Sequence, residues 1–494
     1  MPASGRRIVA VLTHSRIALA GLVLSLTSSS LFLVFLGAEL VGLRTGPYFG
    51  IVGFLFLPVP FVLGLVLIPI GYLRARRRLS ESGGAAAPLA PYPVLDLNVR
   101  RHRRNLLLFG VLTIVNVALL GTASYKGVHY MESDAFCGQV CHTVMRPEFV
   151  ASRTSPHARV GCVHCHVGSG AEWFVRTKLS GVRQLVGVAL HNYPRPIPTP
   201  VQDLRPARET CEECHWPDQH HGDRLRVIRS FAEDEASSEQ VTVLVLHVGG
   251  GHAGGQQAGG IHWHMNLANE ITYIAADESR QTIPWVRLKD ASGGVTDFTA
   301  GDAGLTAAQI ASAAKRTMDC VDCHNRPAHR FEQPDEAADQ AIAALRLDRG
   351  LPFLKQQMVG ALKGSYASRE AALQGIQESL DRYYRENHPE VYARSRKAID
   401  AVIEATRNVH AANVFPEMGV TWGTYPNNLG HESFPGCFRC HDGNHSSPDG
   451  RVIRQDCDTC HALPAMEEPA PAILKDLGVG AESPEGGAPP RAES

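Results

Sequence analysis

The chain has 494 residues, with 48 Lys and Arg against 49 Asp and Glu, 44% hydrophobic residues and 23 histidines. The near-neutral charge argues against a nucleic-acid-binding protein, and long apolar runs argue against a disordered one. Apolar residues are concentrated in the first 125 positions, whereas all 12 cysteines follow residue 136. We therefore expect a membrane region followed by a polar region that carries the chemistry.

Three nearly uncharged segments are long enough for transmembrane helices, which need about 20 residues. They are residues 17–43, 46–73 and 106–124. Basic residues collect on the cytoplasmic side of membrane helices, and eight arginines occupy the loop 74–105 while Arg6, Arg7 and Arg16 precede the first segment. We therefore expect a multi-pass protein of the bacterial inner membrane. Its amino terminus is cytoplasmic, residues 1–124 form the membrane region, and the remainder is periplasmic.

The cysteines form six pairs, and a histidine directly follows the second cysteine of each pair. Five pairs read C-x-x-C-H, and the first has one extra residue between its cysteines. Two thiols at this spacing can bond the two vinyl groups of one haem, and the adjacent histidine reaches the iron. Structural zinc and disulfides do not require that histidine. We therefore expect six covalently bound haem c groups, attached outside the cytoplasm.

The attachment cysteines, motif by motif from one to six, are Cys137 and Cys141, Cys162 and Cys165, Cys211 and Cys214, Cys320 and Cys323, Cys437 and Cys440, and Cys457 and Cys460. The corresponding proximal iron ligands are His142, His166, His215, His324, His441 and His461.

Fourteen further histidines lie beyond residue 125 and outside the motifs, so each iron has a second axial ligand within reach. The candidates, chosen for their closeness to motifs or for their place in constrained turns, are His157, His221, His264, His329, His410, His431 and His445, with His220, His252 and His262 as neighbouring alternates. Met145 offers a thioether to the first iron. For each of these residues, ordinary packing or solvation is the competing interpretation.

Motifs and composition divide the periplasmic part into segments. Residues 125–224 carry motifs one to three, 225–304 form a β-rich insert, 305–334 carry motif four, 335–415 are helical, 416–462 carry motifs five and six, and 463–494 form a disordered tail. Runs rich in Val, Ile and Thr predict strands at 241–248, 271–275 and 283–288. Helices are predicted over 171–190, 305–318, 335–346, 367–386 and 389–412.

Packing against porphyrin replaces much of the usual apolar core in a chain with so many haem motifs. We therefore expect a membrane-anchored multihaem cytochrome in which a mainly helical and irregular, haem-packed domain with a small β-rich insert follows three transmembrane helices. The predicted helix 171–190 combines Trp173, Phe174 and Leu179 with basic residues, which suits a helix lying on the membrane surface. Glu132 and Asp134, just before motif one, are candidate proton acceptors or plain surface carboxylates.

Four stretches resemble the NapC/NirT family of membrane-anchored multihaem quinol dehydrogenases: CGQVCHTVM (137–145), SPHARVGCVHCH (155–166), RETCEECH (208–215) and CVDCHNRPAH (320–329). The resemblance implies that Met145 ligates the first haem, that His329 ligates a haem other than the one held by His324, and that Lys178 belongs to a quinol site. Members usually have one membrane helix and four haems, so this chain is similar to an enlarged, six-haem member.

The expected function is menaquinol oxidation, with electrons relayed from the membrane quinone pool to a periplasmic c-type cytochrome or reductase during anaerobic or extracellular respiration. One alternative is a terminal reductase in which one haem keeps an open site. Another is an electron-transfer subunit fed by a partner. The sequence is compatible with a homo-oligomer and with an additional partner subunit. No nucleic-acid partner is expected.

Overall fold

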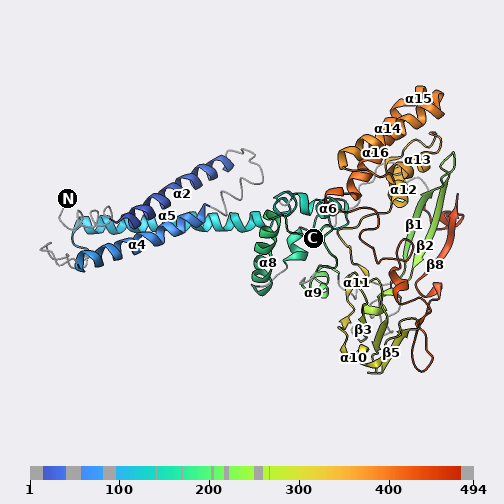
Figure 1. The fold of residues 1–494 in the computed structure, drawn as a ribbon, viewed down its shortest axis with the longest axis horizontal. Coiled ribbons are helices and arrows are strands. Elements are labelled where there is room, and N and C mark those ends of the chain that lie inside the picture. Colours follow the sequence, from blue (N-terminus) through green and yellow to red (C-terminus); the bar gives the residue numbers. More distant parts are fainter. Residues whose placement is uncertain are drawn as a thin grey trace. The chain divides into compact units, whose positions relative to one another are not determined.

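The computed structural model describes residues 15–40, 57–81, 96–140, 142–167, 171–201, 205–215, 222–249, 260–265 and 268–479. It divides into two compact units, Met1–His142 and Thr143–Ser494 (Figure 1). Some of the predicted site residues lie outside the described residues: Cys141, His220, His221 and His252, together with the side chains of His142 and Lys178.

The first unit contains the long helices α2 (Arg16–Leu40), α4 (Pro58–Glu81) and α5 (Arg100–Met131). Two stretches, Arg16–Val34 and Pro58–Ala75, are long and apolar enough to cross a bilayer. Helix α5 covers the third predicted segment, 106–124. The predicted loop 74–105 is partly helical, because α4 continues through its first arginines and arginine is a good helix former.

Small residues let α2 and α4 approach closely. A Cβ atom added at Gly71 would lie 2.3 Å from the backbone nitrogen of Ala18, and one added at Gly64 would lie 2.6 Å from the carbonyl oxygen of Gly21. The Ser15 hydroxyl donates to the carbonyl of Gly71 at 3.0 Å. Close backbone approach and hydroxyl bonds are the usual means of helix association in lipid, where no hydrophobic force joins helices.

Two antiparallel sheets lie in the second unit. The first has the order β1-β2-β8, from β1 (Arg224–Phe231), β2 (Glu239–Leu246) and β8 (His461–Glu468). The second has the order β6-β3-β4-β5-β7, from β6 (Arg316–Thr317), β3 (Glu270–Ile274), β4 (Trp285–Lys289), β5 (Val295–Ala300) and β7 (His445–Ser446).

The β-rich region is therefore not a self-contained insert, because β7 and β8 come from the carboxy-terminal part of the chain. The prediction of disorder from residue 463 is wrong for residues 463–479. Strand β8 bonds to β2 there, with Ala465 opposite Val243, and helix α17 (Ile473–Asp476) follows. Val243 and Ala465 are buried against each other, which anchors a segment whose composition alone favours disorder.

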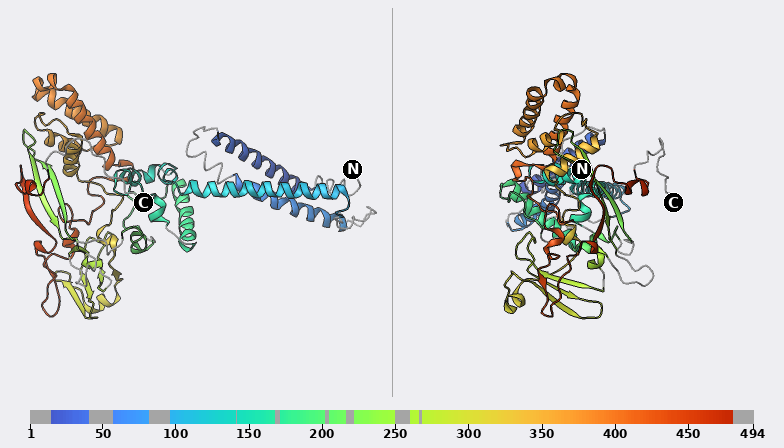
Figure 2. Two further views of the ribbon diagram at one scale, coloured as in Figure 1. Left: turned by 180° about the vertical axis from the view of Figure 1, so that it is seen from behind. Right: turned by 90° about the vertical axis from the view of Figure 1, so that its right-hand side faces the viewer.

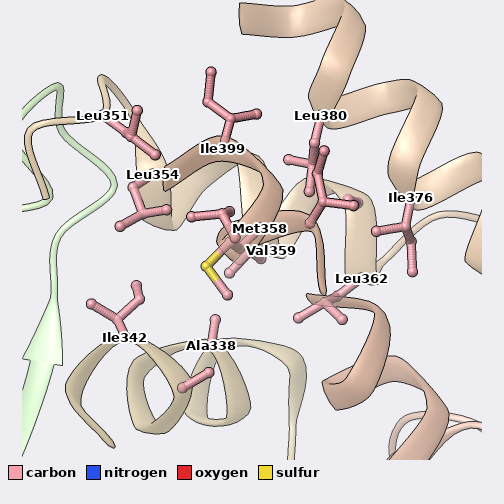
Figure 3. Close-up of a cluster of buried hydrophobic side chains, with 14 of the residues drawn as sticks. Ala338, Ile342, Leu351, Leu354, Met358, Val359, Leu362, Ile376, Leu380 and Ile399 are labelled. Atoms are coloured by element: carbon pink, nitrogen blue, oxygen red, sulfur yellow. The ribbon is translucent and has the colours of Figure 1, made fainter. Parts of the chain in front are cut away.

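A helical segment has a conventional apolar core, contrary to the expectation that porphyrin replaces one. Its helices are α12 (Pro334–Leu345), α13 (Leu354–Leu362), α14 (Arg369–Asn387), α15 (Pro389–Arg394) and α16 (Arg396–Asn413). Leu354, Met358 and Ile376 are fully buried in this core (Figure 3). This segment contains no cysteine, so its helices bury apolar faces against each other, and α14 and α16 lie side by side (Figure 2).

Several helix boundaries differ from the prediction. Helix α10 (Ala307–Ser312) ends early, because the chain turns into strand β6 before motif four. The predicted helix 389–412 is two helices, α15 and α16, separated at Ser395. Helix α13 was not predicted.

Candidate functional site

Three of the motifs adopt the same one-turn backbone geometry. The histidine N–H donates to the carbonyl of the first cysteine at 2.7 Å for His215, 2.8 Å for His324 and 3.1 Å for His441. Residues three and four apart lie on one face of such a turn. Both thiols and the imidazole therefore start from the same face, as a haem bonded to two cysteines and one histidine requires.

The first motif uses a wider turn to accommodate its extra residue. Residues Phe136–Val140 form a π-helical turn, η2, which holds Cys137 and ends directly before Cys141. A π-helix closes its hydrogen bonds over five residues instead of four, and single turns of this kind are frequent at functional sites. The inserted residue is thus absorbed in the backbone between the two cysteines.

The competing interpretations of the cysteines are disulfides and structural zinc. Among the described cysteines, the nine other than Cys137 and Cys162 form no disulfide. Within the described ranges, no group of three or more His, Cys, Asp or Glu side chains is placed to hold a metal ion, whereas structural zinc needs four ligands around one point.

Five motif histidines each face a histidine from elsewhere in the chain. The ring centroids are 6.1 Å apart for His166 and His329, 5.8 Å for His215 and His157, 6.4 Å for His324 and His262, 5.7 Å for His441 and His264, and 6.1 Å for His461 and His431. Metal–imidazole bonds are about 2 Å long, so two imidazoles on opposite sides of one metal have nitrogens about 4 Å apart. The Nε2 atoms of His264 and His441 lie 3.5 Å apart, so these residues fit a haem iron with two histidine ligands.

In four of these histidines, the Nδ1 atom lies within hydrogen-bonding distance of a backbone carbonyl oxygen. The Nδ1 atom of His157 lies 3.1 Å from the Pro327 carbonyl oxygen, and that of His264 lies 2.7 Å from the Ile261 carbonyl oxygen. The Nδ1 atom of His329 lies 3.0 Å from the Glu148 carbonyl oxygen, and that of His441 lies 2.6 Å from the Arg454 carbonyl oxygen. Such partners fix the proton on Nδ1 and leave the Nε2 lone pair for a metal.

Burial lowers the pKa of His166, His264, His329 and His461 below the ordinary histidine value. A lowered pKa favours the neutral imidazole, which is the form that binds metals. The electrostatic environment and the geometry of these side chains therefore agree.

The described histidines among the predicted distal candidates fall into two groups. His157, His264, His329 and His431 face motif histidines, whereas His410 and His445 do not. His410 is buried beside Tyr366 and Trp422 in the helical segment. His445 has Nδ1 2.9 Å from an Asp442 carboxylate oxygen and Nε2 2.7 Å from the Ile283 carbonyl oxygen, so both nitrogens are already engaged. Met145 packs against an apolar cluster that includes Val144 and Phe331.

His262 was only an alternate in the sequence, yet it faces His324. It lies with His264 on one short 3-10 helix, η5 (Ile261–Met265), so two residues of one turn face two different motifs. The alternation H-W-H is the signal that could have indicated this, because neighbouring positions in a tight turn point in different directions.

Neighbouring cysteines link motifs two to six in chain order. Burial raises the pKa of Cys165, and the nearby Cys214 thiol raises it further. A hydrogen bond joins Cys211 to Cys320. Burial raises the pKa of Cys323 to about 11, with a smaller contribution from Cys437.

The last link of the series joins motifs five and six. Burial raises the pKa of the Cys460 thiol, and Cys437 contributes to the rise. Each motif from two to five therefore has the next motif along the chain as a close neighbour.

The predicted quinol-site residues lie near the start of this series in the sequence. Glu132 follows α5, and Asp134 lies two residues before η2; both side chains are half-buried. Lys178 lies on α8 (Ala171–Ala189). The described part of α8 and the residue that follows it expose an apolar stripe of Leu179, Val182, Val186 and Leu190.

Similarity to known proteins agrees with these sites. The chain is 40% identical over 447 residues to the cytochrome c-type protein ImcH of Geobacter sulfurreducens, covering 90% of this chain and 87% of that protein. It is 28% identical over 122 residues to the cytochrome c-type protein NrfH of Wolinella succinogenes, covering 23% of this chain and 68% of that protein. No protein-family model and no solved structure matches the chain.

The similarity to ImcH covers most of both chains and therefore shows the family. The shorter match to NrfH agrees with the family resemblance of the haem motifs. Covalently bound haem, electron transfer with partner proteins and membrane association follow from that membership. The chain belongs to the family of membrane-anchored multihaem c-type cytochromes that includes ImcH.

Proposed function

We propose that this protein oxidises a menaquinol-type quinol at the bacterial inner membrane and passes the electrons, through six covalently bound haem c groups, to a periplasmic c-type cytochrome or reductase. The haem groups supply one-electron chemistry. The chain supplies the ligands, the spacing and the electrostatic environment.

The observation that carries this proposal is the set of five opposed histidine pairs. An iron with two histidine ligands has no open position for a substrate, so motifs two to six suit electron transfer better than substrate reduction. In this proposal the second histidine that would hold each haem iron is His329 for motif two, His157 for motif three, His262 for motif four, His264 for motif five and His431 for motif six. The close neighbours among consecutive motifs support a relay in chain order.

The proposed orientation would put the quinol site at the periplasmic surface of the inner membrane. Three transmembrane helices with a cytoplasmic amino terminus would deliver motif one, directly after α5, to the periplasmic side. The apolar stripe of α8 would rest on the bilayer, where an amphipathic helix buries its apolar face. Lys178 on this helix would bind the quinol, and Glu132 or Asp134 would accept the protons that quinol oxidation releases.

The test is anaerobic mixing of the detergent-solubilised protein with a menaquinol analogue while the haem α-band is followed. We expect rapid reduction of most haems, with the rate at least tenfold lower in Lys178→Ala. The matched control is Arg183→Ala, which removes an exposed basic side chain of the same helix. Reduction by dithionite should be complete in all three proteins.

Failure of quinol to reduce the wild-type protein, with dithionite reduction intact, would overturn the dehydrogenase proposal in favour of an electron-transfer subunit fed by a partner. Equal loss in Lys178→Ala and Arg183→Ala would remove Lys178 from the site. A high-spin haem that binds a substrate would indicate a terminal reductase.

A further inference from the structure

Motif four contains a buried carboxylate between its two cysteines. Asp322 is 2% exposed. Its carboxylate accepts hydrogen bonds from the Tyr273 hydroxyl at 2.6 Å, from Arg316 Nε at 2.9 Å and from Arg280 Nη1 at 3.3 Å. It also accepts the backbone N–H of Asp319 at 2.8 Å. A buried charge persists only when it is paired and hydrogen-bonded in this way.

Motif five contains a buried guanidinium at the corresponding place. Arg439, between Cys437 and Cys440, is 8% exposed. It donates to three backbone carbonyls: Gly436 at 2.8 Å, Arg280 at 2.9 Å and Asp322 at 2.6 Å. The variable positions of two haem motifs, more than a hundred residues apart in the chain, are thus bonded to each other.

The charge of Arg439 acts on both motifs. Arg439 directly precedes Cys440, and the Asp322 carbonyl that accepts its 2.6 Å hydrogen bond belongs to the residue directly before Cys323. One cation therefore lies close to a haem-attachment sulfur of motif four and to one of motif five. Asp322 forms ion pairs with Arg280 and Arg316. Among the described residues, Arg439 has no acidic partner of this kind, and its hydrogen bonds go to backbone carbonyls.

We propose that Asp322 and Arg439 form a junction that fixes the separation of motifs four and five and sets the reduction potentials of the two haems they carry. A positive charge near a haem favours its reduced form and raises its potential, and a negative charge lowers it. Burial strengthens both effects, because solvent screens a charge less in a low-dielectric interior. This inference rests on the proposed relay, in which electrons pass between these two haems.

The test is a spectroscopic redox titration of the full-length protein with chemical mediators, which does not depend on quinol oxidation. Asp322→Asn should raise the potential of at least one haem, and Arg439→Gln should lower it, each by about a tenfold change in the one-electron equilibrium, or about 59 mV. Arg439→Lys keeps the charge and should restore most of the wild-type value. The controls are Asp458→Asn, an exposed carboxylate between the cysteines of motif six, and Arg385→Gln, which is exposed on α14 away from every motif; neither should shift a potential appreciably.

Opposite shifts for Asp322→Asn and Arg439→Gln support the proposal. Shifts in the same direction would indicate that both variants merely loosen the site and admit water, which overturns it. If Arg439→Gln does not assemble with a full complement of haem, the nearly isosteric Asp322→Asn decides alone: an unchanged or lowered potential overturns the proposal. Failure of quinol oxidation in the wild-type protein would leave these titrations and their interpretation as charge effects intact.

Discussion

The Nε2 atoms of His264 and His441 lie 3.5 Å apart, although the two residues are 177 positions apart in the chain. His264 belongs to the short helix η5, which precedes strand β3, and His441 ends motif five. The β-rich region therefore positions two of the proposed iron ligands. It holds η5 between motifs four and five, so that His262 and His264 each face one of them.

Replacing His264 by Ala should leave one iron with a single histidine ligand. We expect one haem equivalent of high-spin signal by electron paramagnetic resonance, because the iron loses one strong axial ligand while both thioether bonds remain. The control is His247→Ala, whose ring is hydrogen-bonded to Asp223 near the surface and faces no iron in this assignment. The same signal in both variants, or in neither, would contradict the assignment of His264.

Haem stoichiometry tests the six motifs directly. The purified protein should contain six haems per chain by pyridine haemochrome assay, and Cys457→Ser combined with Cys460→Ser should contain five, because both thioether bonds of motif six are removed. His388→Gln, outside every motif, should keep six. A wild-type value of five would point to the irregular first motif, and mass spectrometry of the peptide spanning it would settle the question.

The contact between α2 and α4 predicts that alanine substitution at two glycines changes the stability of the membrane unit in opposite directions. Gly71→Ala should destabilise the membrane unit by about 1–3 kcal/mol, as overpacking typically does, because its Cβ would meet the Ala18 backbone at 2.3 Å. Gly37→Ala meets nothing within 4 Å and should stabilise α2 by about 0.5–1 kcal/mol, since alanine is the better helix former. Thermal midpoints in detergent measure both, and equal midpoints for the two variants would refute this packing.

Glu332 makes stability depend on pH in a defined direction. Burial raises the pKa of its carboxyl above the ordinary value, so the folded protein holds this proton more tightly than the unfolded chain does. The buried charge is therefore unfavourable near neutral pH, and that cost disappears as the pH falls through the raised pKa to the ordinary one. Glu332→Gln should raise the thermal midpoint at pH 7 and leave it nearly unchanged near pH 4. A lower midpoint at pH 7 would contradict this reading.

The sequence by itself determined the chemistry of attachment. Two thiols and a histidine at fixed offsets, as in Cys320, Cys323 and His324, fall within one helical turn, so spacing alone places them on one face. The apolar segments of the membrane region are equally local signals: α2 and α4 lie over the described parts of the first two, and α5 covers the third. Helix α14, predicted over 367–386 and observed over Arg369–Asn387, follows from its own periodicity.

Only the tertiary structure decided which residues meet across the chain. His329 faces the histidine of motif two rather than that of its own motif, and His262 faces motif four, which lies about sixty residues further along the chain. Strand β8 is ordered because β2 offers it unpaired hydrogen-bonding groups and a buried neighbour for Ala465. Such pairings depend on the free energy of long-range packing, which short-range spacing does not encode. Motifs are therefore readable from the sequence, whereas their partners are set by the fold.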